Sequence, residues 1–562
     1  MTRHDEAGRR FVQLTDEILR TLWSMNPVEA TILGVHDYDG TLGDMSASAI
    51  ESHATALRNC LAALQSEIEP TQLDADDELN YQVALSLVSS NLIMLEMQRP
   101  WMRNPSVYPS MCIWGCFSLL ARRNGEPQEQ ARFMLSRMRE VPEFLAASKA
   151  NIESPVPLFN DYALEVIRGA RWFFESAFAE IAAGAGTLEG ELLRARDQAL
   201  AAFEEYGRWL SEDVAPGGEG DFAVGDHIYR RLLSEEHRLT YSPNDMVEMA
   251  EDVLRETEAE ISDLAARIDP SVSWQDIISR LKDDHPEPDR LIQAYREAFE
   301  SAKAFVIERD LVSLAEGESL DVSETPPFER AIVPYAGYFP PAPFGESRAA
   351  SLWVTPVAEN AAESQRQAQL HGHCTYSIPV IAIHEGYPGH HVQLTRAMDS
   401  EHPLRKQVMN NSFLEGWALY CEQMMYEQGF YTDPRVRLFQ VKDMLWRAWR
   451  VIIDVGMHTA GMTFDEAVRL LVDKARLEEE NAVVEVKRYA MSPTQPMSYV
   501  IGKLLILDLR RRYKENMGPA CDLKDFHDRL LSYGTIPPTL IASRMISEPI
   551  PDRAGICLRR SA

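Results

Sequence analysis

Apolar residues recur every three to four positions along most of the chain, which is the period of an α-helix with one buried face. The segment DMVEMAEDVLRETEAEISDLAARI is an example, with Met246, Val253 and Ile261 on one face. In TFDEAVRLLVDKARLEEE, Thr463 and Glu466 fit the pattern in which a capping hydroxyl and a carboxylate three residues later begin a helix. These features predict a mainly α-helical fold.

Two interruptions of the helical pattern indicate how the chain is organised. The glycine-rich segment APGGEGDFAVGD, residues 215–226, separates an N-terminal helical part at 1–214 from a second helical part at 227–562. Between about 326 and 357, proline, aromatic and β-branched residues replace the helical period, which predicts a small sheet. A surface loop inside one domain has the same composition as the glycine-rich segment, so we expect both parts to form one continuous unit.

The length and charge of the chain exclude several classes of protein. At 562 residues the chain can bury a large core without a structural metal, so a bound metal would serve chemistry. The chain carries 86 acidic and 56 basic residues, and its formal net charge of −30 repels nucleic acid and anionic membranes. We therefore expect no nucleic-acid or membrane partner, and the charge leaves the oligomeric state open.

The cysteines and the first thirty residues predict a cytoplasmic protein. Seven cysteines are scattered along the chain without a Cys-x-x-Cys pair, which suits a reducing compartment. The first thirty residues alternate charged and apolar types too closely for the apolar segment of a signal peptide. Nothing downstream approaches the run of about 18 uncharged apolar residues that a membrane span needs.

The segment VIAIHEGYPGHHVQL, residues 380–394, carries the candidate chemistry. Five of the fourteen histidines fall within the 21 residues from 371 to 391, which overlap this segment, and core packing does not require such a density. A common zinc site places two histidines four residues apart on one helical face, with a glutamate after the first as general base. His384 and Glu385 fit this pattern, but Pro388 stands where the second histidine belongs.

Pro388 predicts how the second ligand is supplied. A proline inside a helix has no N–H to donate and its ring collides with the carbonyl group four residues earlier, so the helix should break or bulge within the motif. If the bulge absorbs two extra residues, His390 takes the position of the second ligand, while His391 remains the alternative. His384 and His390 are then expected to bind one Zn²⁺ ion, with Glu385 as the general base.

Two glutamates downstream are candidates for the third ligand. Glu415, in NNSFLEGWALYCEQMMYEQ, follows His390 by 25 residues on a predicted helix and is the preferred candidate. Gly416 beside it lets another backbone or a substrate approach closely. Glu422 lies two turns later on about the same face, either as an alternative ligand or as a carboxylate that orients a histidine.

Other candidates come from the C-terminal third of the chain. Tyr499 stands where a proline-rich loop becomes an apolar helix, which suits an oxyanion donor and also a tyrosine packed in the core. His458 in DVGMH is an isolated histidine on a helical pattern, typical of a structural residue but also a possible orienting group. Arg488 is a candidate for binding a peptide carboxylate, although an ion pair with a surface glutamate fits the sequence equally well.

Five segments carry a resemblance to a known family: NPVEATILGVHDYD, HEGYPGHHVQ, EGWALYCE, DVGMH and QPMSYVIGK. They resemble the bacterial domain of unknown function 885 family, from about Asn26 to the C-terminal region. That family looks related in fold to the carboxypeptidase Taq family of mostly helical zinc peptidases. The resemblance implies a large helical zincin-like fold, with a deep cleft and the small sheet ahead of the metal-motif helix.

The resemblance also implies a role for each motif residue. The relatives' metal ligands fall on His384, His390 and Glu415, their general base on Glu385, and their oxyanion tyrosine on Tyr499. The inserted residues around Pro388 depart from the peptidase pattern, which keeps His391 as the competing second ligand. The whole chain is then expected to form a peptidase-like unit.

These features predict a zinc-dependent metallopeptidase-like hydrolase that cleaves short peptides, as a carboxypeptidase or an oligopeptidase. Zn²⁺ would polarise the scissile carbonyl group and lower the pKa of its bound water, and Glu385 would take the water proton and deliver it to the leaving amine. Two alternatives stay open. One is a metal-dependent amidase that acts on a small non-peptide amide, and the other is a catalytically inactive helical binding protein.

Overall fold

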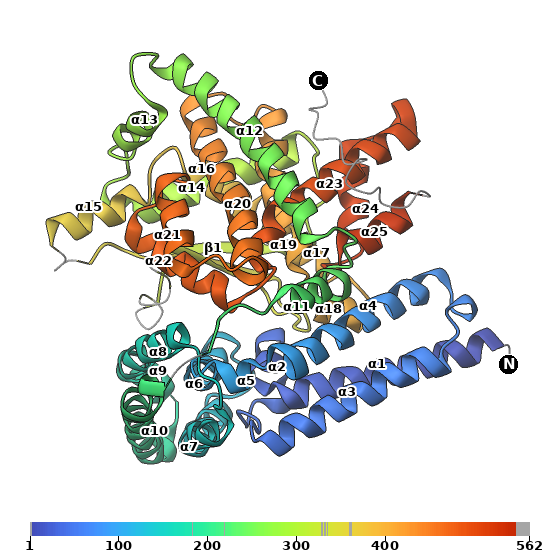
Figure 1. Cartoon of the computed structure of the whole chain (residues 1–562), viewed down its shortest axis with the longest axis vertical. Helices are drawn as coiled ribbons and strands as arrows, with labels where there is room; N and C mark the ends of the chain where they lie inside the picture. Colours follow the sequence, from blue (N-terminus) through green and yellow to red (C-terminus); the bar gives the residue numbers. More distant parts are fainter. Residues whose placement is uncertain are drawn as a thin grey trace. The chain divides into compact units, whose positions relative to one another are not determined.

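The fold is mainly helical, as the hydrophobic period predicts, with a small three-stranded sheet within the described residues (Figure 1). The computed structural model describes residues 3–546 apart from 183, 218, 219, 327–329, 331, 332, 334 and 359–361. The chain divides into two compact units, and the first boundary, between Phe222 and Ala223, lies inside the glycine-rich segment at 215–226. The expected single peptidase-like unit stays a prediction.

Unit 1 comprises Met1–Phe222, Pro326–Ile332 and Ala342–Glu346. Its helices are α1 (Arg3–Met25), α2 (Pro27–Leu33), α3 (Ala47–Glu67), α4 (Ala75–Leu92), α5 (Pro100–Arg103), α6 (Val107–Ala121), α7 (Pro127–Asn151), α8 (Pro157–Ser176), α9 (Phe178–Ala182) and α10 (Glu189–Trp209). Helices α1, α3 and α4 pack side by side, and α7 packs against α6 and α10 (Figure 1). The buried Arg137 of α7 donates to the hydroxyl groups of Thr31 and Ser118 and so joins α7 to α2 and α6.

Unit 2 comprises Ala223–Thr325, Val333–Pro341 and Ser347–Ala562. Its helices are α11 (Asp226–Arg231), α12 (Pro243–Ile268), α13 (Trp274–Leu281), α14 (Leu291–Glu308), α15 (Glu363–His371), α16 (Ile378–Ile381), α17 (His390–Ala397), α18 (Pro403–Gln407), α19 (Asn411–Glu427), α20 (Pro434–Thr459), α21 (Phe464–Asp473), α22 (Glu479–Met491), α23 (Gln495–Met517), α24 (Leu523–Leu531) and α25 (Pro538–Met545). Its core forms where α19 and α20 pack against α23 and α12 packs along α20.

Local sequence signals explain where several helices of unit 2 begin. The capping pair predicted at Thr463 and Glu466 is confirmed at the start of α21, where each side chain bonds to the other residue's backbone N–H. The predicted apolar face at Met246, Val253 and Ile261 is buried on α12. Burial of such faces supplies most of the stability of a helix, because propensity alone is marginal at this length.

Helices α19 and α23 approach each other closely at Gly416. A Cβ atom added to Gly416 would lie 2.5 Å from the carbonyl carbon of Gly502 on α23, which is closer than real Cβ contacts. Gly416 thus lets the backbone of α23 approach α19 closely. A side chain larger than that of glycine at this position should destabilise the fold by at least about 1–3 kcal/mol. The crossing brings together the N-terminal halves of the two helices, one carrying Glu415 and the other Tyr499.

The sheet lies partly ahead of its predicted position. Its strands are β1 (Ser319–Glu324), β2 (Ala336–Phe339) and β3 (Ala349–Val354), in the order β1-β3-β2. Strand β3 runs parallel to β1 and antiparallel to β2. The prediction of about 326–357 therefore includes β2 and β3 and misses β1, because β1 has only two apolar residues, Leu320 and Val322, and buries only Val322. Residues 327–329, 331, 332 and 334 of the predicted stretch lie outside the described residues.

Candidate metal centre

The histidine motif occupies two helical segments that are separated by a break at Pro388. His384 lies in a π-helical turn, Ala382–Gly386, which follows α16, and α17 begins at His390. The Tyr387–Pro388 peptide bond is cis. A Cβ atom at Gly389 would overlap the carbonyl oxygens of Ile383 and His384, so only glycine fits there. The break that Pro388 predicts is present, and it separates the two histidines into different segments.

Trp417 of α19 holds this break in place. Its indole Nε1 donates to the carbonyl oxygen of Pro388 at 2.9 Å and also lies 3.3 Å from that of Gly389. The Trp417 side chain is fully buried, so it gives these carbonyl groups a hydrogen-bond donor where water does not reach them. The histidine motif is thereby fixed against the helix that carries Glu415.

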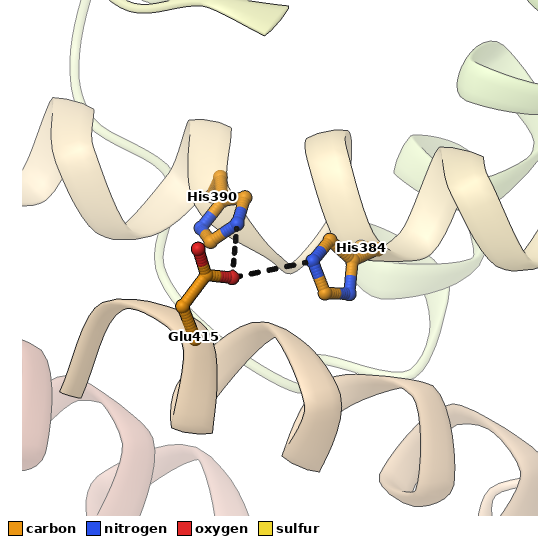
Figure 2. Close-up of side chains that lie close together, drawn as sticks. All are labelled: His384, His390 and Glu415. Atoms are coloured by element: carbon orange, nitrogen blue, oxygen red, sulfur yellow. Dashed lines mark ion pairs between the residues drawn. The ribbon is translucent and has the colours of Figure 1, made fainter. Parts of the chain in front are cut away.

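The residues predicted to bind the metal converge at this point. Ligand atoms of His384, His390 and Glu415 all lie within 4.8 Å of one another. The Oε2 atom of Glu415 lies 3.4 Å from Nε2 of His390 and 3.7 Å from Nε2 of His384. Figure 2 shows the two histidines reaching from successive helical segments toward Glu415 on a third.

The distances within this group suit a shared metal ion better than direct hydrogen bonds. An N–H···O hydrogen bond has a usual length of about 2.9–3.0 Å. Tetrahedral zinc, with bonds of about 2.0–2.1 Å, holds neighbouring ligand atoms roughly 3.3 Å apart. Two imidazole nitrogens and one carboxylate oxygen are also the ligands of many catalytic zinc sites, which leave a fourth position open. The residues therefore fit one Zn²⁺ ion, and its binding stays a prediction.

Glu422 orients His384 rather than joining the ligand group. Its Oε1 accepts a hydrogen bond from Nδ1 of His384 at 2.8 Å, and the carboxylate is 1 % exposed. A histidine held in this way directs Nε2 toward a metal. Of the two roles predicted for Glu422, the structure supports the orienting one.

The charges of this group oppose the effect of burial. Burial alone would lower the pKa of His384, but the carboxylates of Glu415 and Glu422 outweigh it and raise that pKa to about 10. Burial would likewise raise the pKa of Glu415, but His384 and His390 hold it well below its usual range. The group is thus a buried set of opposite charges. A divalent cation that bound there would displace the imidazole proton and take over its positive charge.

His391, the alternative second ligand, belongs to a different group of side chains. Its Nε2 pairs with the carboxylate of Glu318, and its Nδ1 lies 3.1 Å from the hydroxyl oxygen of Tyr338. Tyr387 donates to the same Glu318 oxygen at 2.8 Å, and Lys303 pairs with the other at 2.6 Å. Glu318 therefore holds His391 away from the three converging ligand atoms, and no sequence motif marked Glu318.

The predicted catalytic residues lie within electrostatic reach of the ligand group. Glu385 follows His384 in the π-helical turn, and its charge contributes to the raised pKa of that histidine. Tyr499 on α23 is 7 % exposed. Burial and then the charge of Glu415 raise the pKa of Tyr499, while Arg450 opposes both. Each of the two side chains therefore interacts electrostatically with a proposed ligand, Glu385 with His384 and Tyr499 with Glu415.

The structure does not bring His458 and Arg488 to the ligand group. His458 is buried on α20, where its Nε2 lies 3.1 Å from the carbonyl oxygen of Tyr489 and its ring stacks on that of Tyr229. Arg488 on α22 pairs through Nη2 with Glu485 at 2.7 Å. His458 therefore has a structural place in unit 2. Arg488 forms an ion pair with a glutamate, and its role in binding a peptide carboxylate stays a prediction.

The family comparison covers almost the whole of the described chain. A family model described as a bacterial protein of unknown function, DUF885, matches residues 27–545. The chain belongs to this family. The resemblance predicted from the sequence motifs is thereby confirmed, while the relation of this DUF885 protein to carboxypeptidase Taq stays a prediction. No curated protein matches the chain.

Two solved structures are similar in fold to this DUF885 protein. One is a "putative lipoprotein of unknown function" from Shewanella oneidensis, with a TM-score of 0.80 and 24% identity over 95% of this chain and 99% of its own. The other is a "putative lipoprotein" from Colwellia psychrerythraea, with a TM-score of 0.82 and 18% identity over 95% of this chain and 98% of its own. At these identities the likeness shows the fold.

The predicted cytoplasmic location is wrong, because both of these structures are described as lipoproteins. One of the two patterns on which it rested, the alternation in the first thirty residues, has another cause: α1 is an amphipathic helix that buries Phe11, Leu14 and Ile18. The alternation of charged and apolar residues there is explained by the packing of α1 inside unit 1. It does not indicate the cellular compartment of the protein. In the part of the chain that the structure describes, no helix has both the length and the apolar character to cross a bilayer.

Proposed function

We propose that this DUF885 protein is a zinc-dependent hydrolase that cleaves peptide bonds. The observation that carries the proposal is the convergence of His384, His390 and Glu415 from three helical segments, with separations that suit a tetrahedral metal. Glu385 beside His384 and Tyr499 near Glu415 add the groups that such a reaction needs. A zincin-like arrangement, with a cleft that admits an extended peptide, belongs to the same proposal.

The side chains have distinct tasks in this proposal. His384, His390 and Glu415 would hold the zinc ion, and Glu422 fixes the ring of His384. When bound, zinc supplies a Lewis acid that polarises the substrate carbonyl group and acidifies water. Glu385 takes a proton from the attacking water and delivers it to the leaving amine. Tyr499 donates its hydroxyl hydrogen to the carbonyl oxygen as negative charge develops there.

Removal and return of the metal tests the proposal. The purified protein is incubated with a mixture of short peptides, and the products are identified by mass spectrometry. We expect cleavage at peptide bonds that stops after treatment with a chelator and returns when zinc is added in equal amount to the protein. Cleavage that persists in the metal-free protein, or an absence of cleavage in the zinc-loaded protein, would contradict the proposal and favour a metal-independent or a binding function.

Tyr499→Phe separates a catalytic tyrosine from a packed one. The change keeps the ring and removes the hydroxyl group, so loss of an oxyanion donor should lower turnover by roughly 10²–10³-fold. Zinc content and thermal midpoint should change little, because the contact of the Tyr499 hydroxyl with Gln495 is long, at 3.5 Å. All three quantities are measured on one preparation. Unaltered turnover together with a lowered midpoint would assign Tyr499 to the core.

A further inference from the structure

Arginine side chains gather around Tyr499, the residue that is proposed to donate to the substrate oxygen. The guanidinium carbon of Arg450 lies 4.7 Å from the centre of the Tyr499 ring, and that of Arg447 lies 6.0 Å from it. Both arginines project from the same face of α20, three residues apart. Arg488 of α22 shares the carboxylate of Glu485 with Arg450. Cations are thus concentrated at one tyrosine in a chain whose net charge is −30.

Some of the guanidinium N–H groups have no acceptor in the part of the chain that the structure describes. Nε of Arg450 donates to the Tyr489 hydroxyl at 2.8 Å and Nη2 pairs with Glu485 at 3.0 Å, but Nη1 is buried without a hydrogen-bond partner among the described residues. Nε of Arg447 is also buried without one. Leaving such charged donors unsatisfied is costly. A carboxylate is the matching ligand, since its two oxygens accept parallel hydrogen bonds from a guanidinium group.

The arginines and the proposed ligand Glu415 both act on the hydroxyl group of Tyr499. Burial and the charge of Glu415 raise the pKa of Tyr499, whereas Arg450, Arg488 and Arg447 lower it. The exposed fraction of the arginine side chains rises from 4% at Arg450 through 13% at Arg447 to 39% at Arg488. The group therefore extends from the interior beside Tyr499 to the surface, where a ligand can reach it.

We propose that Arg447, Arg450 and Arg488 bind the free α-carboxylate at the C-terminus of a peptide substrate. The inference rests on the proposed function and restricts the proposed peptide cleavage to bonds near the C-terminus of the substrate. Because Tyr499 donates to the carbonyl group of the bond that is cleaved, a carboxylate held beside Tyr499 belongs to a residue close to that bond. The enzyme then removes residues from the C-terminal end and does not cleave within long chains.

Binding of matched acids and amides tests this inference without depending on turnover. The probes are N-acetyl dipeptides that end in Ala, Phe, Lys or Glu, each as the free acid and as the C-terminal amide. Their dissociation constants are measured by calorimetry on the zinc-loaded full chain carrying Glu385→Gln, in which hydrolysis is suppressed. For at least one pair we expect the acid to bind about 10–100-fold more tightly, as loss of a charge-assisted hydrogen bond implies.

Arginine variants show which side chains cause the tighter binding of the acid. Adding Arg447→Gln, or separately Arg488→Gln, should bring the ratio of the two dissociation constants toward one. Arg488 is partly exposed, so its variant should fold even if the Arg447 variant does not. Arg435→Gln is the matched control, because it removes a positive charge from α20 about 18 Å along the helix from Arg447, and it should leave the ratio unchanged.

The inference is overturned by equal affinities of acid and amide in every pair, by an absence of binding, or by a preference that survives both arginine variants. Failure of the proposed function has a different signature. In that case the acids would still bind in preference to the amides, and the preference would still depend on Arg447, while the zinc-loaded wild-type chain would release no amino acid from the same dipeptides.

Discussion

Replacing Glu385 with glutamine is expected to lower peptide hydrolysis by at least about a hundredfold while zinc stays bound. Glutamine keeps the size of the side chain and its place beside His384, but it cannot accept the proton of the attacking water. Glu385 is absent from the converging ligand atoms, so its loss should not release the metal. Turnover and zinc content are measured on the same preparation of each protein.

The control for this variant is Glu427→Gln, the same substitution at an exposed position on α19. It changes the net charge by the same amount, and it should leave both turnover and zinc content unaltered. Full turnover in the Glu385→Gln protein would show that another group is the base. A loss of zinc along with activity would instead place Glu385 among the ligands.

His390→Ala should release zinc, and His391→Ala should retain it. His390 is one of three side chains whose ligand atoms converge, and the two that remain cannot complete a site. His391 is paired with Glu318, which is 5% exposed, so its loss leaves a buried carboxylate with fewer partners. The His391 variant should therefore lower the thermal midpoint and keep about one zinc per chain.

Zinc content and thermal midpoint of both variants distinguish the assignments. Equal loss of zinc from the two proteins, or greater loss from the His391 variant, would contradict the geometry of the motif. The glutamates give a parallel comparison: Glu415→Ala removes a ligand, whereas Glu422→Ala removes the partner of His384. Loss of an orienting group costs about 10–100-fold in metal affinity, so the Glu422 variant should bind zinc weakly and the Glu415 variant far more weakly.

Features that depend on neighbouring residues were predictable from the sequence. The helical period gave the fold class, and Thr463 with Glu466 marked the start of α21 because a capping pair acts within one turn. Pro388 predicted the break in the motif for the same reason, since its ring acts on the preceding helical turn. From that break followed the choice of His390 over His391, which the converging ligand atoms support.

Features that depend on distant residues were not predictable from the sequence. Glu318 holds His391 from 73 positions away, and neither residue type nor spacing announces such a contact. Strand β1 has only two apolar residues, Leu320 and Val322, which is too short an alternation to mark a strand. The grouping of Arg447 and Arg450 with Arg488 depends on how α20 and α22 lie beside Tyr499, and each arginine alone resembles a member of a surface ion pair.

The zinc content of the purified wild-type chain, measured by elemental analysis after growth with zinc and extensive dialysis, tests the central claim most directly. The convergence of His384, His390 and Glu415 predicts about one zinc ion per chain, and Glu415→Ala should reduce that value to near zero under the same treatment. A wild-type content near zero, or a full zinc ion retained by Glu415→Ala, would contradict the assignment of these residues as a metal centre.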